Sequence, residues 1–85
     1  MNGLRTAGSV FKNPAGDYAG RLLDDCNCRG LRVGGAYVTD FHANIVAVDD
    51  SACASDVLAL SQIMRSRVSF DFGIILDYEI KGVES

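Results

Sequence analysis

Residues 55–68 constrain the fold of this chain more than any other segment, because they predict a helix with one wide apolar face. Ser55, followed by Asp56, suits the N-cap, and Arg65 and Arg67 fall in the last turns, where cations complement the helix dipole. Apolar residues recur three and four positions apart, as on one side of a helix. They are Val57, Leu60, Met64 and Val68, with Leu58 and Ile63 widening the stripe. We interpret this face as core rather than as a cofactor site.

A second helix is predicted over residues 15–27, because apolar residues again follow helical spacing there. They are Ala19, Leu22, Leu23 and Cys26. Strands are expected near residues 9–12, over 36–39 and 44–48, and from residue 74 onward. In the last of these, one set of side chains alternates with another: Ile74, Leu76, Tyr78 and Ile80 against Ile75, Asp77, Glu79 and Lys81.

The element order is strand, helix, two strands, helix and strand, and this order favours an α+β fold. We expect a small mixed sheet with two helices packed on one face. No repeat, low-complexity stretch or linker divides the 85 residues, so residues 1–85 are expected to form a single domain.

Charge and hydropathy exclude two classes of partner. The net charge is −3 at pH 7, and the eight Lys and Arg residues are scattered, so we expect no nucleic-acid surface, which needs clustered cations. The longest apolar runs, such as 45–48 and 74–76, are far shorter than the roughly 18 residues of a membrane span. No charged leader precedes them, and the expected compartment is the cytoplasm.

Three cysteines and one histidine provide only a weak metal-binding pattern. Cys26 and Cys28 are one residue closer than the usual zinc pair, and Cys53 and His42 are isolated. We therefore expect free thiols and no metal, with Cys26 buried as a small apolar residue. The sequence also has no Gly-rich phosphate-binding motif, so no cofactor is expected to bind to a site of that kind in this chain.

Residues 8–14 (GSVFKNP), which we call the strand-end motif, place a hydroxyl, an ammonium group and an amide close together. Two interpretations are open: the end of a strand with an ordinary Asn-Pro stop, or a site that handles an anion. Strict alternation would put Ser9 and Phe11 on one face and Val10 and Lys12 on the other.

Several ordered motifs resemble those of the UDP-N-acetylenolpyruvoylglucosamine reductases, the MurB family, and together they extend from about residue 4 to residue 83. The resemblance is to the C-terminal, substrate-binding domain, and the larger FAD-binding domain of the family is absent from this sequence. The motifs are residues 8–14 (GSVFKNP), 18–23 (YAGRLL), 30–39 (GLRVGGAYVT), 42–44 (HAN), 54–58 (ASDVL) and 72–74 (FGI).

The resemblance implies a reaction of peptidoglycan synthesis. In the family, NADPH reduces FAD, and UDP-N-acetylglucosamine enolpyruvate is then reduced to UDP-N-acetylmuramate. A carbanion next to the substrate carboxylate must be protonated, and the resemblance gives this role to Ser9, with Glu79 as the second catalytic group. By the same resemblance Lys12 and Asn13 bind near the UDP diphosphate.

His42 and Asn44 lie in a motif that, in the family, borders the nucleotide, so the resemblance makes them candidate substrate-binding residues. Three positions depart from the family pattern: Lys81 replaces an arginine, Tyr78 a proline, and Phe41 a common lysine. FAD and NADPH are implied for the complete enzyme only.

The resemblance leaves three roles open for the chain itself. It is the substrate-binding domain of a reductase, working with an FAD-binding domain in cis or in trans; or a UDP-sugar binding module without reductase activity; or a remnant that self-associates. For the first role we expect the purified chain to be colourless and unable to oxidise NADPH.

Overall fold

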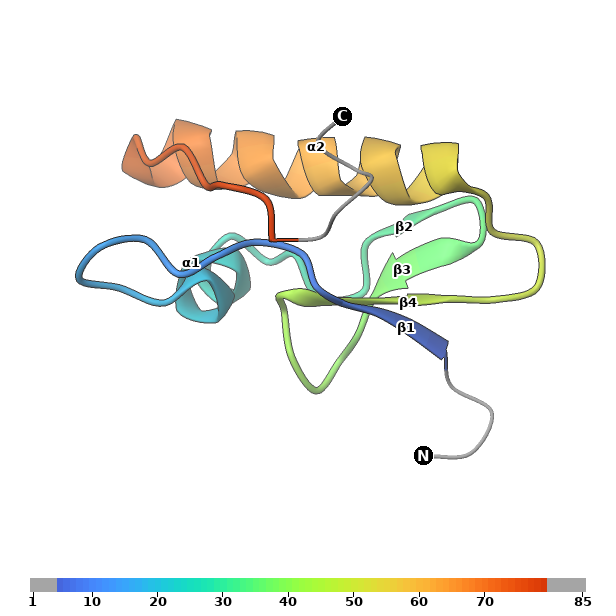
Figure 1. Cartoon of the computed structure of the whole chain (residues 1–85). Helices are drawn as coiled ribbons and strands as arrows, with labels where there is room; N and C mark the ends of the chain where they lie inside the picture. The colour runs from blue at the N-terminus through green and yellow to red at the C-terminus, as the bar shows by residue number, and fades with distance from the viewer. Residues whose placement is uncertain (1–4, 80–85) are drawn as a thin grey trace.

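The computed structural model describes residues 5–79, which form a four-stranded sheet and two helices (Figure 1). All pairings within this sheet are antiparallel, in the spatial order β1-β4-β3-β2. The α+β class predicted from the sequence is therefore confirmed. The elements are, in chain order, β1 (Arg5–Ser9), α1 (Ala19–Asp25), β2 (Arg32–Val33), β3 (Ala36–Val38), β4 (Ile45–Val48) and α2 (Ala54–Phe72).

The described strands are all antiparallel, whereas a mixed sheet was expected, and short connections explain this for β2, β3 and β4. Gly34 and Gly35 form the turn of the β2–β3 hairpin, and residues 39–44 return the chain from β3 to β4. Connections of this length join antiparallel neighbours, because a parallel pair needs a crossover of a dozen or more residues. The strand β2, which was not predicted, contains only two residues.

The helix α2 lies over one face of the sheet and contacts β2 and β3 (Figure 1). Leu60, Met64 and Val68 of the predicted stripe are fully buried, while Ile63 is 40% exposed. The other helix, α1, lies below the C-terminal half of α2 and packs against it (Figure 1). Cys26, just after α1, is only 5% exposed, which confirms the prediction of a buried thiol.

Both ends of α2 differ from the prediction. The N-cap is Cys53 rather than Ser55, and the Asp56 carboxylate accepts hydrogen bonds from the main-chain N–H groups of Cys53 and Gly35, each at 3.2 Å. These bonds hold the pKa of Asp56 below its usual value. The helix continues past Val68 to Phe72 and ends at Gly73, whose φ of 70° is a conformation that favours glycine.

The predicted first helix is shorter than expected, since residues 15–17 form a turn and α1 begins at Ala19. Of the predicted C-terminal strand, residues 74–79 form one isolated antiparallel bridge, between Phe11 and Tyr78. Its predicted alternation is confirmed over residues 74–79: Leu76 is buried, whereas Glu79 is exposed. Residues 80 and 81 lie outside the described part of the chain.

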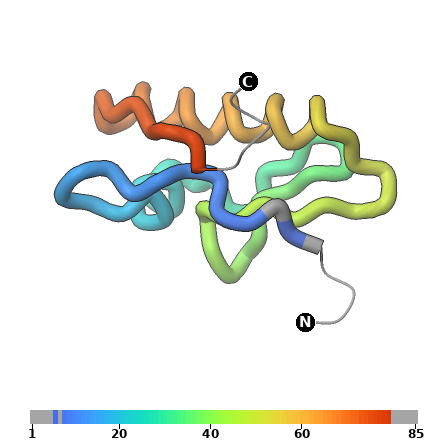
Figure 2. Tube along the Cα trace, in the orientation of Figure 1, coloured from blue at the N-terminus to red at the C-terminus, as the bar shows by residue number. Residues whose placement is uncertain are grey.

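Figure 2 shows that the C-terminal segment, which we define as residues 74–79, returns from α2 to lie beside the chain that follows β1. The two regions come from nearly opposite ends of the described chain. Within residues 5–79, no helix is long and apolar enough to cross a membrane.

Candidate functional site

The strand-end motif begins at the end of β1 and does not follow strict alternation. Gly8 has a φ of 80°, and the pairing of β1 with β4 shifts register between Thr6 and Gly8. Beyond this bulge Ser9 is exposed, but the next two side chains, Val10 and Phe11, are both buried. The alternation expected over residues 9–12 does not hold, because β1 ends at Ser9 and the next two side chains are both buried.

Val10 and Phe11 belong to the hydrophobic core, and main-chain hydrogen bonds hold this part of the motif on both sides. The Val10 N–H donates to the Asn44 carbonyl at 2.9 Å, and the Val10 carbonyl accepts from the Glu79 N–H at 2.8 Å. The Lys12 N–H donates to the Asp77 carbonyl at 2.8 Å. The motif thus lies between β4 and the C-terminal segment.

This arrangement brings Ser9 and Glu79 to the same region. Glu79 is hydrogen-bonded through its main chain to Val10, which directly follows Ser9. Both side chains are exposed. The two candidate catalytic residues therefore lie one position apart across an antiparallel pair, although their side-chain chemistry stays a prediction.

The buried Asn44 side chain holds the strand-end motif through hydrogen bonds to Phe11. It is 4% exposed, its Oδ1 accepts from the Phe11 N–H at 3.0 Å, and its Nδ2 donates to the Phe11 carbonyl at 2.9 Å. The amide is thereby engaged on both sides with the main chain. This supporting role was not predicted, although the sequence placed Asn44 at the start of a buried strand.

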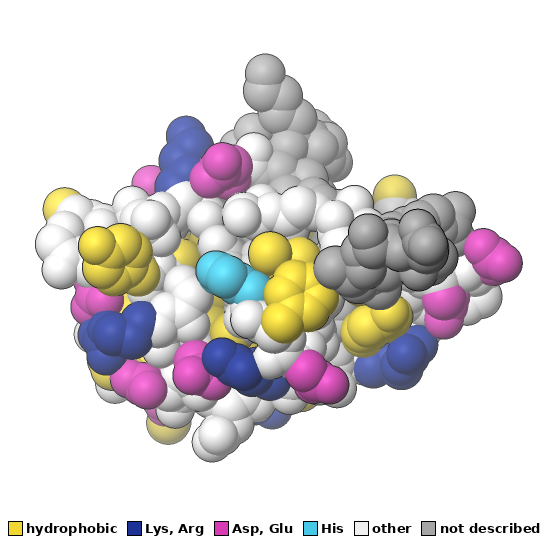
Figure 3. All heavy atoms as spheres, turned by 90° about the horizontal axis from the view of Figure 1, so that it is seen from below, with side chains coloured by type: hydrophobic (Ala, Val, Ile, Leu, Met, Phe, Trp, Pro, Cys, Tyr) yellow, Lys and Arg dark blue, Asp and Glu magenta, His cyan; other side chains and the backbone are white. Residues whose placement is uncertain are grey.

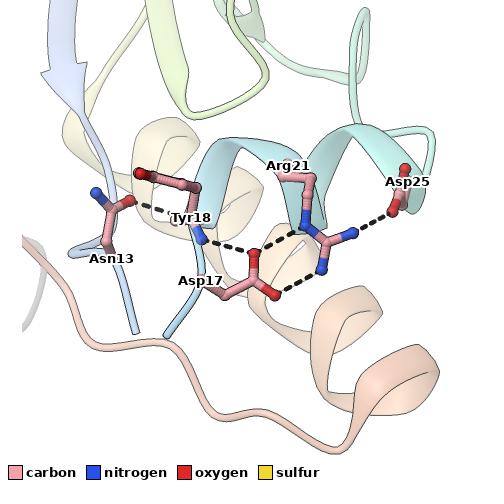
Figure 4. Close-up of polar contacts among 6 residues, drawn as sticks. Asn13, Asp17, Tyr18, Arg21 and Asp25 are labelled. Carbon is pink, nitrogen blue, oxygen red and sulfur yellow. Dashed lines mark hydrogen bonds and ion pairs between the residues drawn. The ribbon is translucent and has the colours of Figure 1, made fainter. Parts of the chain in front are cut away.

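Asn13 and Asp17 shape the entry to α1 (Figure 4). Asn13 Oδ1 accepts from the N–H of Ala19, the first residue of the helix, at 3.0 Å. Asp17 accepts from the Tyr18 N–H and from the Arg21 guanidinium, and the Arg21 hydrogen bond is the main reason that the pKa of Asp17 falls to about 2. In Figure 4 the Asn13 Nδ2 lies on the side away from the helix.

Asn13 and His42 line one open pocket of about 350 Å³. Figure 3 shows the histidine near the centre of its face, beside apolar side chains and flanked by basic and acidic ones. Tyr18 is 68% exposed and Phe41 55% exposed, so aromatic surface is available at this pocket. We call this site the polar pocket; its lining includes Asn13, Tyr18, Arg21, Arg29, Phe41 and His42.

The polar pocket is held in shape by close contacts around His42. Its Nδ1 accepts from the Asn44 N–H at 3.1 Å, and the Thr39 hydroxyl donates to the His42 carbonyl at 2.8 Å. A Cβ added to Gly20 would lie only 2.8 Å from His42 Cε1, so glycine lets α1 approach the ring. No pattern in the sequence indicated this contact.

Charges in the polar pocket are largely compensated. Arg21 bonds Asp17 and also Asp25, the latter at 2.9 Å, while Arg29 pairs with Asp24 at 2.9 Å. Lys12 is exposed in the strand-end motif, next to Asn13. The predicted site residues thus fall into a group near the strand pair and a group in the pocket, joined through the motif.

The three cysteines differ in their exposure to solvent. Cys26 and Cys28 are buried and Cys53 is exposed, and none forms a disulfide. Burial is the main cause that raises the pKa of the Cys26 thiol to about 12. Within residues 5–79, no group of three or more His, Cys, Asp or Glu residues is arranged to hold a metal ion.

A four-stranded antiparallel sheet covered by one long helix, with a polar pocket beside the turn into α1, defines a small α+β domain. More particularly, residues 2–83 match the family model described as UDP-N-acetylenolpyruvoylglucosamine reductase, C-terminal domain. The chain therefore belongs to this family.

Individual relatives agree with the family match. The chain is 45% identical over 76 residues to the UDP-N-acetylenolpyruvoylglucosamine reductase of Chloroflexus aurantiacus, covering 89% of this chain and 26% of the relative. It is 51% identical over 75 residues to the enzyme named reductase 2 of Symbiobacterium thermophilum, covering 88% and 24%.

A solved structure gives the same result. The crystal structure of the reductase (MurB) from Thermus caldophilus superposes with a TM-score of 0.69 at 40% identity, covering 87% of this chain and 26% of that one. The chain thus spans about a quarter of the length of the relatives that it matches.

Proposed function

We propose that this chain is the substrate-binding domain of a UDP-N-acetylenolpyruvoylglucosamine reductase and supplies the proton donor for the reduction of UDP-N-acetylglucosamine enolpyruvate. The observation that carries the proposal is the meeting of the strand-end motif with the C-terminal segment, which sets Glu79 beside the residue following Ser9. In the family, which consists of flavoproteins, bound FAD reduced by NADPH supplies hydride to the enolpyruvyl group. The product is a precursor of peptidoglycan.

In this proposal Ser9 donates a proton to the carbon next to the substrate carboxylate. A serine hydroxyl is a weak acid, but an enolate-like carbanion is a very strong base, so the transfer is feasible once the hydroxyl is held in position. Glu79 stabilises the enolic intermediate or the hydrogen bonds around the donor. Exposure of both side chains supports the proposal, because the substrate must reach them.

The UDP part of the substrate is proposed to lie along the motif and the polar pocket. Asn13 uses its oxygen to cap α1, so its Nδ2 remains as a donor for a diphosphate oxygen, and the neighbouring Lys12 adds a cation. The exposed rings of Tyr18 and Phe41 offer flat surfaces suited to a base or sugar. His42 completes this pocket.

Calorimetry of the chain with UDP-N-acetylglucosamine enolpyruvate tests the binding half. Asn13→Asp is the sharpest variant, because it keeps an oxygen to cap α1 and replaces the donor with a negative charge that repels a diphosphate. Affinity should fall by at least about tenfold, the value of one charge-assisted hydrogen bond. Ser9→Ala is the control and should bind within a few fold of the unchanged chain.

A chimera tests the catalytic half: the chain replaces the C-terminal domain of the Thermus caldophilus reductase. NADPH-dependent turnover should be lost in Ser9→Ala, while reduction of the flavin by NADPH continues. Binding without turnover in the unchanged chimera would instead favour a UDP-sugar binding module. Absence of binding heat together with self-association would favour a remnant, and either result would contradict the proposal.

A further inference from the structure

Tyr78 fastens the C-terminal segment to the rest of the domain through its side chain. Its ring stacks on that of Phe11, with centroids 5.1 Å apart and planes 28° apart. The Arg65 guanidinium lies 5.3 Å from the centre of the Tyr78 ring, and Arg65 Nε donates to the Leu76 carbonyl at 2.9 Å. Ser61 Oγ lies 3.5 Å from the Tyr78 hydroxyl.

The main-chain hydrogen bonds around Tyr78 explain why its side chain is needed to hold the C-terminal segment in place. The Lys12 and Glu79 N–H groups form the hydrogen bonds on either side of the Phe11–Tyr78 bridge. Phe11 and Tyr78 are therefore a non-hydrogen-bonded pair, in which side chains approach closely and the Tyr78 N–H takes no part in the pairing. The Tyr78 side chain adds contacts to Phe11 and α2 that this main-chain pairing does not supply.

The outer side of this segment is exposed among the described residues. Ile75 is 60% exposed, and Asp77 and Glu79 are also exposed. The segment forms only an isolated bridge rather than a strand within the described residues. A carboxylate in such a segment keeps one position only if the backbone beneath it is anchored.

We propose that Arg65 and Tyr78 are positioning residues that hold Glu79 beside Ser9. The inference rests on the proposed function, because it gives Glu79 the role assigned there. Arg65 acts from α2 by binding the Leu76 carbonyl and covering the Tyr78 ring. Tyr78 acts on the next residue, Glu79, by locking the bridge to Phe11.

Amide hydrogen exchange of the chain tests the anchor without any ligand. Tyr78→Leu keeps apolar volume but removes the ring, and the Glu79 amide should exchange about tenfold faster, as expected from the loss of one aromatic pair and one cation–π contact. The Val10 amide, bonded to Asn44, should be unchanged. Tyr78→Phe keeps the ring and should behave like the unchanged chain.

Tyr37→Leu is the matched control. Arg32 lies 4.6 Å from the Tyr37 ring, so this variant removes the same kind of contact at the β2–β3 edge. Exchange of the Glu79 amide should not respond to it. An equal response to both variants, or none to Tyr78→Leu, would overturn the anchor.

The chimera described above supplies the functional readout. Tyr78→Leu should lower kcat about tenfold with little change in KM, since Tyr78 does not line the polar pocket, and Tyr78→Phe should restore kcat. Faster exchange with unchanged kcat would overturn the positioning role. Glu79→Gln separates the two proposals. A fully active Glu79→Gln variant refutes the role of Glu79 in the proposed function, and the positioning role with it; an impaired Glu79→Gln variant beside a fully active Tyr78→Leu variant refutes the positioning role alone.

Discussion

Replacement of Asn44 by alanine should destabilise the domain strongly, because this amide is the partner of both main-chain groups of Phe11. Asn44→Ala leaves the Phe11 N–H and carbonyl without the bonds of 3.0 and 2.9 Å that they form in a buried site. Each buried group left unsatisfied costs about 1–3 kcal/mol, so the expected loss is about 2–6 kcal/mol. The total stability of a chain of this length is about 4–13 kcal/mol.

Urea unfolding followed by circular dichroism measures this loss. The midpoint should fall with little change in the m value, and the melting temperature should drop by at least about 10 °C. Asn13→Ala is the matched control, since it removes one bond from an exposed asparagine to the Ala19 N–H, and the loss of such a cap costs about 1 kcal/mol. If Asn44→Ala cost no more than Asn13→Ala, the reasoning about Phe11 would be refuted.

Three further predictions concern single side chains. Arg21 lowers the pKa of Asp17 to about 2, so the ionised Asp17 stabilises the fold above pH 4, and this stability is lost as the pH falls towards 2. Arg21→Met should flatten this part of an acid unfolding curve, and an unaltered curve would count against the ion pair. Cys53 alone should react promptly with a thiol reagent in the native protein, because the other cysteines are buried; three equal rates would contradict the burial. Gly20→Ala should add helix propensity of about 1 kcal/mol yet displace the His42 ring, visible as a shift of its Cε1 proton resonance, and an unmoved resonance would argue against the close contact.

The sequence predicted α2, β3 and β4 because their apolar residues repeat with a clear period. The ends of α2 were harder to predict from the sequence, since they depend on other parts of the chain. Asp56 bonds the N–H of Gly35 in the β2–β3 hairpin as well as that of Cys53, so the cap is partly a tertiary contact. At the other end, Phe70 is 90% exposed and lies off the apolar stripe, and only Gly73 marks where the helix stops.

Periodicity also missed the short and irregular parts of the sheet. Two residues of β2 are too few to show alternation, and β1 ends at Ser9, where the alternation was expected to begin. Short connections account for the antiparallel pairing of β2, β3 and β4, whereas β1 and β4 pair although α1, β2 and β3 lie between them in the chain.

The candidate site was reached through the family resemblance rather than through local pattern. Nothing in the residues near Ser9 indicates that Glu79 lies close by, because the contact joins distant parts of the chain. The double hydrogen bond from Asn44 to Phe11 was equally hidden, since an asparagine before a buried strand fits a turn just as well. The polar pocket could not be predicted from the sequence, because it forms where α1 lies next to residues 41–43.

The bridge between Phe11 and Tyr78 has a consequence for how this domain is made. A growing polypeptide exposes the strand-end motif early, and it can complete the sheet and begin α2 while residues 74–79 are still unsynthesised. The bridge that brings Glu79 close to Ser9 then forms last. It joins two segments far apart in the sequence, and contacts of that kind form slowly. Proteolysis between α2 and the C-terminal segment would remove the buried Leu76 and the ring stacked on Phe11, so it would weaken the core as well as separate Glu79 from Val10.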